Sequence, residues 1–85
     1  MLSNRESGYG RYDVCVIPNN PQQLGVVMEF KTSSRTSLQA TAQEALQQIV
    51  DKDYAAMLRS RGITHILGLG LAFYKKQVVI TDRYL

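Results

Sequence analysis

The sequence predicts an α/β domain, in which one long helix covers a mixed β-sheet, and three observations lead to this prediction. Residues 11–17 and 25–31 are rich in β-branched and aromatic side chains that alternate in polarity, as is typical of strands. Residues 37–59 contain neither Gly nor Pro and are rich in Ala, Leu and Gln, as a long helix requires. Two more strand-like segments follow, at residues 64–73 and 77–81.

The connections between these segments predict how the strands pair. Residues 18–23 form a short loop with two prolines and two asparagines, which favours antiparallel pairing of the strands on either side. The helix then acts as a crossover, so the strand after Gly62 is expected to run parallel to an earlier one. The last strand is expected at an edge of the sheet. We expect a short helix or turn before the first strand.

Composition limits the classes of protein that this chain can represent. At 85 residues, one domain spanning 1–85 is expected. The net charge of +3 is a mild bias toward polyanions and decides nothing by itself. A single cysteine, Cys15, excludes an intrachain disulfide framework, and one cysteine with one histidine cannot form a structural zinc site. The sequence shows neither a signal peptide nor a membrane-spanning run, so a reduced, cytoplasmic protein is predicted.

Two carboxylates lie inside apolar strands, where they need a compensating partner. Asp13 lies in the first strand and Glu29 in the second, and Glu29 shares a strand face with Lys31, about 7 Å away. If the register places Asp13 opposite them, two carboxylates and a lysine converge, and oxygen ligands of this kind suit Mg²⁺ or Mn²⁺. The alternative is an ordinary solvated sheet face with a weak surface ion pair.

Polar residues on the helix border the same region. Gln48 and Lys52 are four residues apart at one border of the apolar arc, where they could reach over the sheet to this site. The alternative is a polar helix flank. Tyr54 lies at the opposite border and fits either a packing role or a site role. His65 and Cys15 are interpreted as structural residues.

Taken together, these segments resemble the PD-(D/E)XK nuclease superfamily. The closest likeness is to the branch whose nuclease domain usually follows an AAA-ATPase-like domain in bacterial and archaeal proteins. The resemblance extends from Glu6 to about Ile80, and the ordered series is more specific than an isolated Glu-x-Lys. The quoted segments are Glu6-Ser-Gly-Tyr-Gly-Arg-Tyr-Asp13, Val-Met-Glu29-Phe-Lys31, Glu44-Ala-Leu-Gln-Gln48-Ile-Val-Asp-Lys52-Asp-Tyr54 and Gly68-Leu-Gly-Leu-Ala-Phe73.

The resemblance implies a role for each matching position. Asp13 matches the metal-binding aspartate of the superfamily and Glu29 its second carboxylate, so these two are expected to hold Mg²⁺ or Mn²⁺. Lys31 matches the lysine that positions or activates the attacking water. Glu6 matches an acid on the first core helix. Gln48, followed by Lys52 and Tyr54, resembles the Gln and Tyr motif of the RecB-like branch.

The implied activity is metal-dependent hydrolysis of phosphodiester bonds in DNA, with RNA as the alternative substrate. The residues expected to contact nucleic acid are Arg11, Arg35, Lys52 and Tyr54, with Lys75 and Lys76 available as further basic residues. The rival interpretation is a non-catalytic module that uses the fold for nucleic-acid binding or protein assembly.

Two departures from the family pattern shape the remaining expectations. Five residues precede Glu6, so the first helix is expected to be truncated or missing from a minimal restriction-endonuclease-like fold. The ATPase-like domain is not on this chain and is expected on a separate or missing segment, so the chain is either a small stand-alone member or a fragment. Because one helix covers one sheet face, the other face is expected to be covered by a second copy, most simply in a homodimer.

Overall fold

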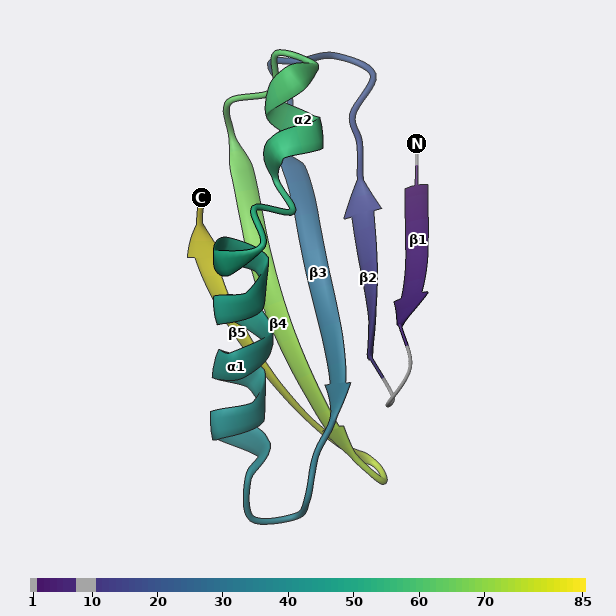
Figure 1. Cartoon of the computed structure of the whole chain (residues 1–85), viewed down its shortest axis with the longest axis vertical. Coiled ribbons are helices and arrows are strands. Elements are labelled where there is room, and N and C mark those ends of the chain that lie inside the picture. The colour runs from purple at the N-terminus through teal and green to yellow at the C-terminus, as the bar shows by residue number, and fades with distance from the viewer. Residues whose placement is uncertain (1, 8–10) are drawn as a thin grey trace.

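The computed structural model describes the backbone of residues 2–7 and 11–85, and the side chains from residue 14 onward (Figure 1). Five strands form one sheet in the order β1-β2-β3-β4-β5. β3 and β4 run parallel, and the other neighbouring strands are antiparallel. The elements are β1 (Leu2–Ser7), β2 (Arg11–Val16), β3 (Gly25–Thr32), α1 (Leu38–Asp51), α2 (Ala56–Ser60), β4 (Ile66–Tyr74) and β5 (Gln77–Tyr84).

The predicted pairing of the central strands is confirmed. β2 and β3 form the expected antiparallel pair, α1 is the crossover to the parallel strand β4, and β5 lies at an edge. Gly62 adopts φ of 83° just after α2, a left-handed conformation that suits glycine at the end of a helix. Within the described residues, no helix is long and apolar enough to cross a membrane.

The expected helix or turn at the start of the chain is wrong, whereas the first core helix, expected to be truncated or missing, has no counterpart among the described residues before β2. Leu2–Ser7 forms strand β1 instead, which pairs with β2 along its whole length. These residues include no β-branched side chain, so their own sequence gives little strand signal. Pairing with β2 therefore determines their conformation.

The single long helix expected over residues 37–59 is divided into α1 and α2. Asp53 lies between them with φ of 50°, a left-handed conformation that aspartate tolerates better than most residues. The amide of Tyr54 donates to the carbonyl of Ile49 at 3.2 Å, a bond that closes the end of α1. Ile49 and Leu58 are about two and a half turns apart, so they would face opposite sides of a continuous helix. The break allows both side chains to be fully buried.

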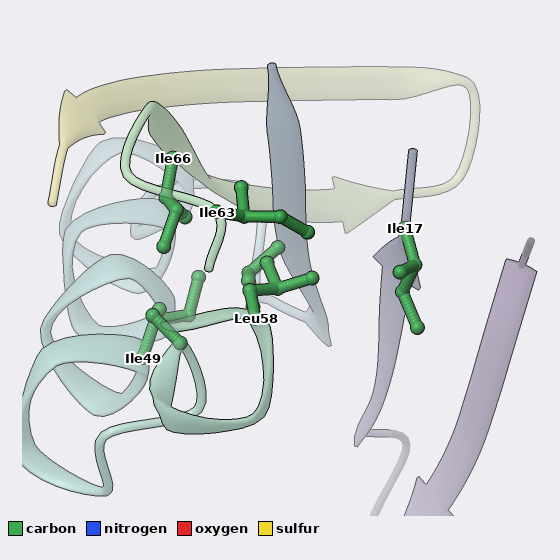
Figure 2. Close-up of a cluster of buried hydrophobic side chains, with 7 residues drawn as sticks. Ile17, Ile49, Leu58, Ile63 and Ile66 are labelled. Atoms are coloured by element: carbon green, nitrogen blue, oxygen red, sulfur yellow. The ribbon is translucent and has the colours of Figure 1, made fainter. Parts of the chain in front are cut away.

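The hydrophobic core lies between the two helices and one face of the sheet. Figure 2 shows side chains from the segment after β2, from α1, from α2 and from β4 converging there. The buried cluster consists of Ile17, Val27, Ile49, Ala55, Leu58, Ile63 and Ile66.

Gly70 sets how closely α1 approaches the sheet. A Cβ atom at Gly70 would lie 2.6 Å from the amide nitrogen of Leu46, and it would also overlap the carbonyl oxygen of Ala42. Both are backbone atoms of α1, so the helix rests directly on the backbone of β4. Only glycine allows this distance between helix and sheet.

The face of the sheet away from the helices is largely apolar, and no element of the described part of the chain covers it (Figure 1). Alternation and register place the outward side chains of β2, β3, β4 and β5 there. The apolar ones of β3 and β4 are half-buried by one another, while Val78 and Ile80 of β5 are 49% and 57% exposed. The apolar side chains on this face are Val14, Val16, Val26, Met28, Phe30, Leu67, Leu69, Leu71, Phe73, Val78 and Ile80, and Thr32, Asp82 and Tyr84 share the face with them.

Candidate metal and nucleic-acid site

The register of β2 against β3 brings the two predicted acids to the same place on the sheet. Asp13 lies opposite Glu29, and Arg11 lies opposite Lys31. Directly opposed positions on antiparallel strands share a face, with their Cβ atoms about 5 Å apart. This face also bears the helices, because Val27 alternates in phase with Glu29 and is fully buried in the core.

Glu29 is the one charged side chain that is buried among residues 14–85, and none of its surface is exposed. Removing a carboxylate from water is unfavourable by several kcal/mol unless a cation or hydrogen-bond donors compensate it. This burial excludes the solvated-face alternative for Glu29. A buried carboxylate in register with a second acidic position is an arrangement that a cation would stabilise.

Lys31 emerges from the same strand face near the start of α1. Its side chain is 16% exposed, and its Nζ donates to Oε2 of Glu44 at 3.4 Å. The Glu44 side chain is 66% exposed. The sequence analysis gave Glu44 no role. Its spacing of four residues before Gln48 places both on one helix flank, and this spacing is the signal that could have identified it.

Gln48 lies one helical turn beyond Glu44 on α1. α1 runs antiparallel to β3 (Figure 1). Four helical residues rise about 6 Å, and two strand residues span about 7 Å. If Glu44 reaches Lys31, Gln48 is therefore level with Glu29. Its Oε1 atom is buried and accepts no hydrogen bond from the residues whose side chains are described.

These residues fit a hard divalent cation. Two carboxylates and a buried amide oxygen are ligands that Mg²⁺ and Mn²⁺ prefer. Among residues 14–85 no three His, Cys, Asp or Glu side chains cluster closely enough to hold a metal ion. A cation at this place therefore depends on Asp13 together with Glu29.

One of the comparisons with known proteins identifies a family. A family model described as the PD-(D/E)XK nuclease superfamily matches residues 1–83. The chain belongs to the PD-(D/E)XK nuclease superfamily. No curated protein matches the chain, and no solved structure matches it. The mixed sheet with one long helix is consistent with a small restriction-endonuclease-like fold, and Glu29-Phe30-Lys31 supplies the (D/E)XK series on β3.

Glu6 does not have the place that the resemblance to PD-(D/E)XK nucleases implies. It lies in β1 and not on a helix, and it is in register with Tyr12. The neighbouring pair is Arg5 with Asp13. Since strand positions alternate between faces, the position of Glu6 is on the opposite face from Asp13.

The residues expected to bind nucleic acid are spread along this PD-(D/E)XK domain. Arg35 is exposed in the turn before α1, whereas Lys52 is exposed at the far end of that helix. Tyr54 is half-buried and packs against the core cluster, as its packing interpretation predicts. Arg11 is opposite Lys31 in register, and its side chain lies outside the described residues.

Proposed function

We propose that this PD-(D/E)XK domain hydrolyses phosphodiester bonds in DNA, with Mg²⁺ or Mn²⁺ held by Asp13 and Glu29. RNA is the alternative substrate. The observation that supports the proposal most strongly is the register of Asp13 with the buried Glu29, with Lys31 two residues further on the same face. An isolated surface ion pair gives no reason to bury a carboxylate, whereas a metal ligand does.

The proposal divides the chemistry among a few side chains. A bound cation would polarise the scissile phosphate and lower the pKa of a coordinated water. Lys31 orients the attacking water and stabilises negative charge that develops on the phosphate. Glu44 holds the lysine ammonium from the helix side at 3.4 Å. The buried amide oxygen of Gln48, which is level with Glu29, is suited to accept a hydrogen bond from a metal-bound water.

Cleavage of labelled DNA by the purified chain tests this function. The chain should cut single-stranded or duplex DNA in Mg²⁺ or Mn²⁺ and lose this activity in EDTA. Lys31→Ala and Asp13→Asn should abolish cleavage without lowering the melting temperature, while Arg61→Ala, which removes an exposed charge far from the site, should retain it. A wild-type chain that cuts no form of DNA or RNA in either metal would refute the proposal.

We also propose that the uncovered sheet face packs against a second copy of the chain. Four strands spaced about 4.8 Å apart and about 25 Å long present about 500 Å². Monomers rarely expose apolar patches beyond a few hundred Å². Two such faces together would bury about 1,000 Å², the size at which stable interfaces begin. A symmetric dimer would also carry two sites, as suits cutting both strands of a duplex.

Light scattering tests the dimer directly. The expected mass is twice the 9.6 kDa of the chain, and a 9.6 kDa particle at micromolar concentration would refute it. The same apolar face favours the rival function, a non-catalytic assembly module. A chain that dimerises but neither binds metal nor cuts nucleic acid would establish this rival.

Two narrower assignments rest on the sequence. The motifs that resemble the superfamily support membership of the branch associated with an AAA-ATPase-like domain. Such a domain would then be a partner, on the same or a separate chain. Cys15 is half-buried and is the single cysteine of the sequence, which fits the proposed reducing cytoplasm.

A further inference from the structure

A basic cleft lies at the turn between β4 and β5, away from the carboxylates. It has a volume of about 410 Å³ and is open to solvent. The residues that line it are Arg35, Tyr74, Lys75, Lys76 and Gln77. Three of these carry a positive charge, and none of them carries a negative charge. The cleft therefore has an uncompensated positive potential that attracts anions.

The backbone of this turn presents a lysine where glycine is the usual residue. Tyr74 and Gln77 are paired in register, so Lys75 and Lys76 form the two-residue loop of a β-hairpin. Lys75 has φ of 53°, a conformation that glycine or asparagine adopts with less strain. Its Nζ lies 5.4 Å from the centre of the Tyr74 ring, which holds the ammonium by a cation–π contact.

The cleft and the candidate metal site share one face of the sheet. Lys31 is in register with Ala72, and Tyr74 follows Ala72 by two residues, so both side chains project to the face that bears the helices. The amide of Ser33 donates to the carbonyl of Phe73 at 2.7 Å, which ties the turn containing Arg35 to β4. From Ala72 to Lys75 the strand covers about 10 Å, close to the rise of three nucleotides.

We infer that the cleft formed by Arg35, Tyr74, Lys75 and Lys76 binds backbone phosphates of the DNA strand, about three nucleotides from the phosphate at Lys31. This assignment rests on the proposed nuclease function for the position of that phosphate. The guanidinium of Arg35 suits bidentate phosphate contacts, and the two ammonium groups act as point charges. The Tyr74 ring offers a surface on which a base or sugar can pack. Such contacts position the strand and carry no sequence preference.

Fluorescence anisotropy with a labelled 20-nucleotide DNA, single-stranded and duplex, tests this inference in EDTA, where cleavage cannot occur. The test variant is Lys75→Gly with Lys76→Gln. The control is Arg61→Gln with Arg83→Gln, which removes the same charge at the other end of β4. We expect the test variant to weaken binding at least about tenfold at low salt. The slope of log K against log salt should fall by about 1.8 for duplex DNA, because two phosphate contacts are lost. The control should change affinity less than about threefold.

The melting temperature keeps a loss of binding separate from a loss of fold. Lys75→Gly removes backbone strain, so the test variant should melt at or above the wild-type temperature. Equal weakening by both double variants, or no binding by the wild type, would overturn the inference. If only the test variant loses binding and the wild type never cleaves DNA, the phosphate-binding role of the cleft is supported and the nuclease function is refuted. If the wild type cleaves DNA and the test variant binds DNA as tightly as the wild type, the phosphate-binding role of the cleft is overturned and the nuclease function is not.

Discussion

Gly70→Ala should displace α1 from the sheet, and the size of the effect follows from the structure. The new Cβ would lie 2.6 Å from the amide nitrogen of Leu46, where ordinary contacts are about 3.5 Å. Backbone atoms cannot rotate away, so the whole helix must move by about 1 Å. Overpacking of this kind destabilises a protein by about 3 kcal/mol. In a domain of this size, that corresponds to a fall in melting temperature of about 12–24 °C.

Gly68→Ala is the matched control, two residues earlier on the same face. There a Cβ would meet the ends of the Leu46 and Leu85 side chains at 3.3 Å, and these can rotate. Thermal unfolding followed by circular dichroism should therefore show a much smaller loss. Because α1 carries Gln48 and Glu44, nuclease activity of the folded Gly70→Ala protein should also fall, by about a hundredfold for a 1 Å displacement. Equal melting temperatures for the two variants would refute the close approach of α1 to β4.

Three further predictions test the site and the core. Saturating Mg²⁺, at about a hundred times its Kd, should stabilise the folded chain by about 2.7 kcal/mol in thermal melts, and Glu29→Gln should lose this shift; an unchanged wild-type melting curve would contradict the metal site. Glu44→Gln should lower kcat several-fold at constant KM. It should change the free energy of unfolding by less than about 1 kcal/mol, since Glu44 is largely exposed in its ion pair with Lys31. An unaltered kcat would contradict the role of Glu44 in positioning Lys31. Leu58→Ala should destabilise by about 2–5 kcal/mol in urea unfolding, and the exposed Met57→Ala should not; similar losses would contradict the docking of α2 on the core.

The sequence was sufficient for the central strands and for the acids that they carry. Alternating β-branched residues on either side of a proline-rich loop predict the β2–β3 hairpin, and Asp13, Glu29 and Lys31 stand out because charge interrupts an apolar pattern. Register is a different kind of property, since it depends on which pairing buries most apolar surface. The sequence therefore does not determine whether Asp13 lies opposite Glu29. The structure shows that it does.

The parts that could not be predicted depend on tertiary contacts. Nothing in Leu2–Ser7 favours a strand, and only pairing with β2 creates one. The break between α1 and α2 at Asp53 has no Gly or Pro to mark it, although the position of Leu58 off the apolar arc of the helix is a usable signal. The pairing of Glu44 with Lys31 and the contact of α1 with Gly70 both require knowledge of how the helix lies on the sheet.

The sheet order has a consequence for how the chain folds. β1, β2 and β3 follow one another in sequence and in space, so their pairing closes only short loops and should be fast. Pairing β4 with β3 instead closes the chain from residue 33 to residue 65, which is slower because more loop entropy is lost. The hairpin that aligns Asp13 with Glu29 can thus form early, before α1 settles on Gly70. During that interval the two acids would lack Glu44 and Gln48 beside them, so we expect the candidate site to be complete only after α1 has docked on the sheet.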